Sequence, residues 1–230
     1  MKLTLLTGGR FEDIVFKDLP RLGEVDVLIF AGNILKKVDL VAEMEGTTET
    51  LKQLCLLSKN LDCVLFAGCD TEVCGSLHKS CAAIDAGELL GIVDMVNVVD
   101  ETAYSAGGGY RVFDTSKGKF GVIVGEDLYF PEVAKMLALC ESDLIVSVFG
   151  KIGNSMPEVM MRGSAFSNGV DICMVAEGYA QVADIKGELV YAGNDRIRSL
   201  ELRLCKDYHL VSSRQRGRYR ELGSSWLCDE

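Results

Sequence analysis

The stretch F-G-V-I-V-G-E-D-L-Y-F-P-E (residues 120–132) predicts a strand, a tight elbow and a helix. The apolar run from Phe120 to Val124 is typical of a buried strand. Gly125 then permits a sharp turn, and Pro131 suits the first turn of a helix whose apolar residues recur at helical spacing. Such an elbow presents side chains into a cleft, although an isolated segment of this kind also fits a plain strand-to-helix connection.

Length and charge limit the classes of protein to consider. The chain has 230 residues, 48% of them hydrophobic, which is enough for one well-buried core. Its 24 basic and 34 acidic residues give a formal net charge of −10, which argues against nucleic acid and against an anionic membrane surface as partners. No apolar run approaches the ~20 residues of a transmembrane helix. The apolar N-terminal run is too short for a signal peptide and is interpreted as the first strand.

The cysteines favour a reduced, cytoplasmic compartment. The nine cysteines lie mostly within apolar runs, where a free thiol behaves as a small hydrophobe. Their odd number and irregular spacing oppose a disulfide framework. Cys69, Cys74 and Cys81, with His78 among them, come closest to a zinc site, but their spacing fits none of the usual ligand pairs. We therefore predict no metal and no cofactor.

Strands and helices alternate along the chain. Strands are predicted at 3–6, 26–30, 63–68, 144–148 and 172–175. Hairpins are predicted at 82–92, with the turn at 85–87, and around 184–188. Helices are predicted from 47 or 48, where a threonine could cap the first turn, to Asn60, then at 131–140 and 157–168. Many strands covered by few helices imply a layered α/β sandwich. We assign residues 1–212 to one domain and 213–230 to an extended C-terminal tail.

The C-terminal tail differs in charge from the rest of the chain. Arg214, Arg216, Arg218 and Arg220 form a basic strip, and Trp226 follows it. One interpretation is a solvated extended tail. The other is docking, in which the tail crosses to the acidic body of a second subunit and its arginines pair with carboxylates there.

Residues 113–132, F-D-T-S-K-G-K-F-G-V-I-V-G-E-D-L-Y-F-P-E, followed by S-D-L-I-V at 142–146, resemble the nucleophile region of the nitrilase, or carbon-nitrogen hydrolase, superfamily. The resemblance implies a four-layer α-β-β-α sandwich, here with a shortened N-terminal helix region, and hydrolysis of non-peptide carbon-nitrogen bonds. The nucleophilic cysteine of that family aligns with Gly125. A glycine has no side chain that could attack a carbonyl or nitrile carbon.

The other two members of the family's Glu-Lys-Cys triad are also replaced in this alignment. The glutamate base aligns with Gly32 and the lysine with Met95. In the family the three side chains act as one unit, so the base and the cation have little left to assist once the nucleophile is gone. The resemblance therefore predicts a catalytically inactive homologue, a pseudoenzyme with a binding or regulatory role in the vestigial cleft.

Three further residues are candidates for lining that cleft. They are Asn33, Glu101, which matches the family's accessory glutamate, and Glu126. Because Met95 replaces a lysine, we expect Glu101 and Glu126 to lie without that cation. Glu101 could instead fix the glycine loop at 107–109. The predicted ligand is a small amide, amine or carboxylate, and we expect the neighbouring Asp127 to cap the following helix.

Two alternatives remain beside the inactive homologue. An amide hydrolase with relocated residues could use Cys69, Cys74 or Cys81, or a water held by Glu101 and Glu126. A purely structural role is the other alternative.

Assembly is predicted from the same resemblance. Relatives of this kind pair through helices that correspond to 131–140 and 157–168. The second of these carries a methionine-rich face, which suits an interface as well as a core. We therefore predict a homodimer.

Overall fold

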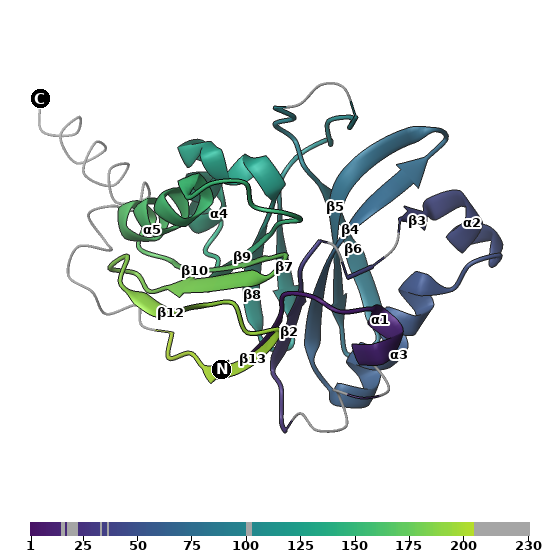
Figure 1. Ribbon diagram of the computed structural model, residues 1–230, viewed down its shortest axis with the longest axis horizontal. Helices are drawn as coiled ribbons and strands as arrows, with labels where there is room; N and C mark the ends of the chain where they lie inside the picture. The colour runs from purple at the N-terminus through teal and green to yellow at the C-terminus, as the bar shows by residue number, and fades with distance from the viewer. Residues whose placement is uncertain (15–16, 18–22, 33, 36, 100–102, 205–230) are drawn as a thin grey trace, which may run out of the picture.

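The structure is a computed structural model that describes residues 1–204 apart from 15–16, 18–22, 33, 36 and 100–102. Two mixed β-sheets lie face to face, and helices cover their outer faces (Figure 1). The predicted four-layer α-β-β-α sandwich is therefore confirmed. The predicted tail at 213–230 lies outside the described residues.

The first sheet has the strand order β13-β1-β2-β4-β5-β6, with the short β3 paired to β4. Strands β1, β2 and β4 are parallel, and the long β4–β5 hairpin continues the sheet in antiparallel register. The strands are β1 Lys2–Leu6, β2 Val27–Phe30, β3 Val38–Asp39, β4 Val64–Val73, β5 Ser76–Asp85, β6 Glu88–Asp94 and β13 Ile197–Glu201.

The second sheet has the order β12-β11-β10-β9-β8-β7. Its central strands β8, β9 and β10 are parallel, with Val124 opposite Val148 and Val148 opposite Val175. The C-terminal ends of these strands therefore meet at one edge, where Gly125 follows β8. The strands are β7 Arg111–Thr115, β8 Gly118–Val124, β9 Leu144–Val148, β10 Asp171–Ala176, β11 Tyr179–Ala183 and β12 Leu189–Gly193.

Two apolar cores follow from the alternation of side chains along these strands. Leu144 and Val146 of β9 belong to the core between the sheets, where the rings of Phe66 and Phe120 lie 5.4 Å apart. Ile145 points the other way, into the core beneath the helices. Strands buried on both faces need apolar residues at every position, which explains the continuous apolar runs in the sequence.

Five helices and one 3-10 turn are assigned within the described residues. They are α1 Phe11–Asp13, α2 Leu40–Glu45, α3 Thr50–Leu61, α4 Pro131–Leu139, α5 Met156–Asn168 and the 3-10 helix η3 Gly125–Tyr129. The predicted helices at 131–140 and 157–168 are confirmed as α4 and α5. Helix α1 has three residues, and much of the segment that follows it lies outside the described residues.

The predicted start of α3 is wrong. Neither Thr47 nor Thr48 caps it, since the helix begins at Thr50. The carboxylate of Glu43 in α2 instead accepts hydrogen bonds from the backbone N–H groups of Thr50 and Leu51, at 2.7 and 3.0 Å. A side chain from the preceding helix thus satisfies the free donors of the first turn.

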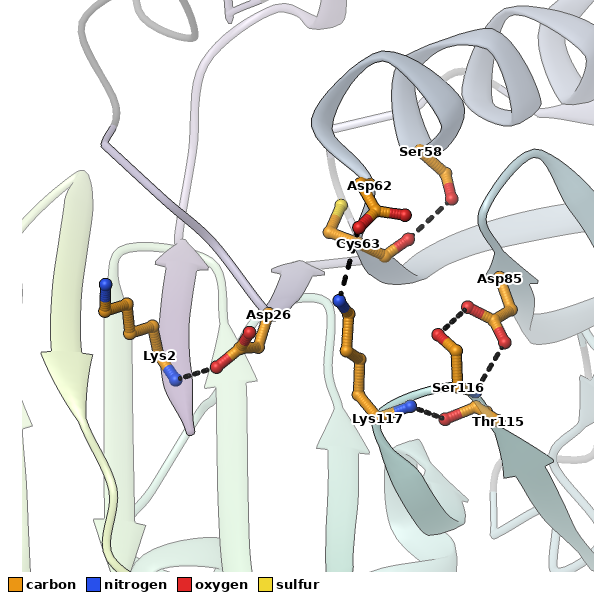
Figure 2. A network of polar contacts seen from close by, with 9 residues as sticks. All are labelled: Lys2, Asp26, Ser58, Asp62, Cys63, Asp85, Thr115, Ser116 and Lys117. Carbon is orange, nitrogen blue, oxygen red and sulfur yellow. Dashed lines mark hydrogen bonds and ion pairs between the residues drawn. The ribbon is translucent and has the colours of Figure 1, made fainter.

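Polar contacts join the two sheets at the end of the sandwich away from Gly125 (Figure 2). The carboxylate of Asp85, the last residue of β5, accepts hydrogen bonds from the backbone N–H and the hydroxyl of Ser116, both at 2.7 Å. Beside them, the ammonium of Lys117 lies 3.5 Å from the carboxylate of Asp62. These contacts hold the β7–β8 turn of the second sheet on the first sheet.

Candidate functional site

The predicted strand, elbow and helix are confirmed at the C-terminal end of β8. The strand ends at Val124, η3 begins at Gly125, and α4 begins at Pro131. Gly125 has a φ of +53°, in the left-handed region that glycine adopts without strain and other residues adopt at a cost. The elbow therefore has a left-handed backbone conformation at Gly125, the position from which a side chain would face the end of the sheet.

Met95 fills the space beside Gly125. Its side chain, just after β6, is 2% exposed. A Cβ atom placed on Gly125 would lie 3.0 Å from the Met95 sulfur and 3.7 Å from Cδ of Lys79. Met95 and Gly125 are two of the three positions that the sequence resemblance aligned with the family's triad, and the structure brings them together. A side chain at position 125 would meet the Met95 sulfur.

Asp127 fixes the segment that carries Met95. Its buried carboxylate accepts hydrogen bonds from the backbone N–H of Val96 at 2.9 Å, and from the backbone and side-chain N–H groups of Asn97 at 2.7 and 2.8 Å. Burial raises the pKa of Asp127, and these three donors oppose that rise. The expectation that Asp127 caps α4 is wrong. The N-cap residue of α4 is Phe130, and no side chain caps this helix.

Gly32 lies against the loop that follows β9. Its backbone N–H donates to the carbonyl of Phe149 at 2.8 Å. A Cβ atom on Gly32 would lie 3.1 Å from that oxygen and 3.1 Å from the nitrogen of Gly150. Since β9 is the neighbour of β8, position 32 contacts the strand end next to the one that carries Gly125. A side chain at position 32 would meet backbone atoms there.

Met95 supplies no cation to Glu126, but a lysine on another strand does. The ammonium of Lys79, on β5, lies 2.9 and 3.0 Å from the two carboxylate oxygens of Glu126. It also lies 5.0 Å from the centre of the Tyr104 ring, and the Tyr104 hydroxyl donates to Asp70 at 3.2 Å. Burial raises the pKa of Asp70, which the Tyr104 hydroxyl and Lys79 oppose. A carboxylate, an ammonium and an aromatic ring therefore adjoin the elbow.

Sequence reasoning missed Lys79, although one signal could have found it. The backbone carbonyl of Lys79 accepts the N–H of Met95 at 2.8 Å, because β5 and β6 are antiparallel neighbours. The predicted hairpin with its turn at 85–87 places residues near 79 and 95 opposite each other. Counting back from that turn would have identified a lysine beside Met95. The two other predicted pocket residues, Asn33 and Glu101, lie outside the described residues.

The three cysteines considered as relocated nucleophiles do not lie on one loop. Cys69 and Cys81 are buried in β4 and β5, and Cys74 is exposed at the turn between these strands. Burial raises the pKa of Cys69 to about 12, and that of Cys81 also lies well above its ordinary value. Both buried residues therefore carry neutral thiols at neutral pH.

The order and arrangement of these elements match a known family along most of the chain. The family model described as "Carbon-nitrogen hydrolase" matches residues 29–203, which include β2, the elbow and the second sheet. The chain belongs to the carbon-nitrogen hydrolase family. Members of this family are hydrolases that act on non-peptide carbon-nitrogen bonds. A protein named "Probable nitrilase C965.09", from Schizosaccharomyces pombe, is 37% identical over 73 residues, a stretch that spans 30% of this chain and 27% of that relative.

Solved structures of the carbon-nitrogen hydrolase fold cover nearly the whole chain. Saccharomyces cerevisiae Nit3, a member of branch 10 of the nitrilase superfamily, matches with a TM-score of 0.73 and 16% identity over 96% of this chain and 93% of that chain. A carbon-nitrogen hydrolase from Helicobacter pylori G27 gives a TM-score of 0.74 and 17% identity over 100% and 95% of the two chains. The TM-scores establish a shared fold, and at identities this low they show the fold alone.

A third similar structure records a reaction at the active-site cysteine of an amidase. It is an amidase mutant from Nesterenkonia sp. AN1 in which acrylamide has added to the active-site cysteine. It matches with a TM-score of 0.72 and 15% identity over 98% of this chain and 99% of that chain.

Neither a membrane span nor a metal centre is found in the described part of the chain. Its helices are too short or too polar to cross a bilayer. The same residues hold no group of three or more His, Cys, Asp or Glu placed to bind a metal ion.

The contact between Met95 and Gly125 predicts how much unfolding free energy is lost when a side chain is added at position 125. The variant Gly125→Ala should lose roughly 1–2 kcal/mol of unfolding free energy for its left-handed backbone, plus a further loss from crowding Met95. Gly178 provides the control, because it has a φ of +72° and no atom within 4 Å of an added Cβ. Gly178→Ala should therefore lose only the free energy that comes from the left-handed backbone. Urea unfolding of both variants measures the difference. Equal losses would show that Met95 does not pack on position 125.

Proposed function

We propose that this chain is a catalytically silent carbon-nitrogen hydrolase homologue that works by binding. The single observation that carries the proposal is the Met95 sulfur, 3.0 Å from the position where a side chain of residue 125 would begin. That residue aligns with the nucleophilic cysteine of the family. An apolar thioether takes up the space beside an elbow that has kept its left-handed turn.

The chemistry of the family explains why the replacements act together. There a glutamate takes the thiol proton, the cysteine attacks the carbon, and a lysine with backbone N–H groups stabilises the oxyanion. Gly32, Met95 and Gly125 occupy the aligned positions and supply none of these groups. Loss of the nucleophile alone forfeits most of the rate enhancement. With the base and the cation also absent, no covalent intermediate forms at the elbow.

The relocated hydrolase is less well supported. A buried thiol with a raised pKa, as at Cys69 and Cys81, is a poor nucleophile because the thiolate is the reactive form. Both carboxylate oxygens of Glu126 accept hydrogen bonds from Lys79, so that carboxylate is not available as a general base unless the pair opens.

The Lys79–Glu126 pair supports a binding role at the same place. Its side chains are 31% and 27% exposed, so a small molecule can reach both. An ammonium and a carboxylate side by side suit a ligand with a carboxylate, an amine or an amide, and the Tyr104 ring next to them offers an apolar face. The ligand class is therefore a small amide, amine or carboxylate.

The absence of turnover is the direct test of this function. The purified protein should release no ammonia above background from a panel of aliphatic amides, ω-amides of dicarboxylic acids and nitriles. The Helicobacter pylori carbon-nitrogen hydrolase serves as the comparison protein. The variant Gly125→Cys should also stay at background, because positions 32 and 95 supply no base or cation and the nearby Lys79 and Glu126 are paired with each other. Turnover by the unmodified chain that is lost in Glu126→Gln would overturn the proposal in favour of a relocated hydrolase.

We also propose that two copies of the chain pair through α4 and α5. These helices pack on each other over the second sheet and form its outer layer (Figure 1). Met136 of α4 and Met156 of α5 are 40% and 52% exposed. Exposed methionines on neighbouring helices suit an interface, because the side chain adapts its shape and buries apolar area.

Sedimentation tests the pairing. The chain should sediment as a species of twice its 25.1 kDa mass. The double variant Met136→Lys/Met156→Lys should shift it to the monomer, because two buried ammonium groups at an interface cost several kcal/mol. Met44→Lys on α2, where the methionine is 89% exposed, is the matched control and should leave the mass unchanged. A 25.1 kDa species for the unmodified chain would refute the pairing.

A further inference from the structure

A cavity lies on the outer face of the second sheet, apart from the elbow. It is a groove of about 490 Å³ between helix α5 and the hairpin formed by β11 and β12. Both elements lie in the same part of the molecule in Figure 1. A groove of this volume is large enough for a small molecule.

Gln181 places a polar group without a partner in this groove. Its side chain, on β11, lines the groove although the residue is only 2% exposed. Among the described residues the side-chain oxygen has no hydrogen-bond partner. A buried carbonyl oxygen without a donor is costly, and such groups in native proteins call for an explanation. A ligand that donates a hydrogen bond in the groove would supply one.

Gly163 keeps the groove open. It lies in the interior of α5, where glycine is the least favourable residue apart from proline. A Cβ atom on Gly163 would have no atom within 4 Å, so close packing does not require glycine there. Val159 and Phe166, four residues before and three after, lie on the same side of the helix and also line the groove. Glycine at position 163 lowers the stability of the helix and leaves free the space that a side chain would occupy in the groove.

The hairpin is held firmly on the helix. The side-chain Nε of Arg162 donates to the carbonyl of Gly187 at 3.0 Å. Gly187 has a φ of +74°, and a Cβ atom there would lie 3.0 Å from the carbonyl oxygen of Arg162. The carboxylate of Asp184 accepts the backbone N–H groups of Lys186 and Glu188, both at 2.9 Å, which sets the shape of the turn. The walls of the groove are therefore formed before any ligand arrives.

The walls offer one apolar surface and charges of both signs. Val159, Phe166 and Leu189 are exposed apolar side chains, at 63%, 45% and 45%. The guanidinium of Arg162 uses Nε for the hairpin, and its Nη groups are the donors suited to a carboxylate. Glu158 also lines the groove, and the hydroxyl of Tyr179 donates to it.

We propose that this groove binds a small carboxylic acid that carries an amide group. The amide pairs with the side chain of Gln181, the apolar part packs on Phe166 and Leu189, and the carboxylate faces Arg162. An amide is the best-matched group because its N–H and C=O complement those of a glutamine side chain in either orientation of the latter. This site is separate from the elbow, so the inference does not depend on whether the elbow is catalytically silent.

N-acetyl-L-leucine is a suitable probe, since it combines an amide, an aliphatic side chain and a carboxylate. Titration of the full chain, followed by ligand-observed NMR, should show saturable binding at millimolar concentration or below. L-leucine, which lacks the amide, and N-acetyl-L-leucinamide, which lacks the carboxylate, should each bind about tenfold more weakly, the equivalent of 1.4 kcal/mol.

Gly163 provides a matched pair of variants. Gly163→Leu fills the groove with a good helix former and should abolish saturable binding while the thermal midpoint stays the same or rises. Gly163→Ala improves the helix in the same way but leaves most of the space, so it should retain binding. Gln181→Met, similar in size but without the amide, should weaken binding about tenfold.

Three results would overturn the proposal. The first is the absence of saturable binding of N-acetyl-L-leucine to the unmodified chain. The second is equal binding by the Gly163→Leu variant. The third is a change in sedimenting mass with Gly163→Leu while the titration is unaltered, which would assign the groove to contact with a second copy of the chain.

Discussion

The three hydrogen bonds accepted by Asp127 are the constraint on which the candidate site depends. They run from the first turn after β8, in the second sheet, to the backbone of Val96 and the backbone and side chain of Asn97, just after β6 in the first sheet. Because Met95 directly precedes Val96 in the chain, the same bonds hold its side chain against Gly125. The two sheets are thereby fixed to each other at the edge where parallel strands end.

This constraint sets the elbow without any contribution from a side chain at position 125. The elbow is set by backbone conformation at Gly125 and by a buried carboxylate at Asp127, and neither requires a thiol at position 125. The ion pair of Lys79 and Glu126 places a cation beside the elbow from another strand. Membership of the carbon-nitrogen hydrolase family therefore fixes the architecture of this chain but not its activity.

Sequence reasoning recovered the elements whose signals are local. The apolar run before Gly125, the proline that begins α4 and the turn at 85–87 each predicted an element that the structure contains. Sequence reasoning failed where a side chain distant in the chain decides where an element begins. Glu43 satisfies the first turn of α3, which no capping pattern at Thr47 or Thr48 could reveal.

Only some residues of the candidate site could be predicted, because the others are brought there by contacts between distant parts of the chain. The alignment placed Met95 and Gly125 in one site, and they are in contact. Lys79 was missed because it lies on the strand paired to the segment of Met95, and only the register of β5 and β6 relates the two. Asp127 was assigned to the following helix because the hydrogen bonds that it accepts come from residues about thirty positions earlier in the chain.

The account's central claim is that the elbow holds no activated nucleophile, and the rate of acrylamide addition to each cysteine tests it most directly. Addition to the folded chain is followed by peptide mapping. Within the described residues, exposed Cys74 and Cys140 should react slowly, at the rate of an ordinary free thiol, and buried Cys69 and Cys81 should not react. Fast and selective addition at Cys69 or Cys81, slowed by Glu126→Gln, would contradict the account.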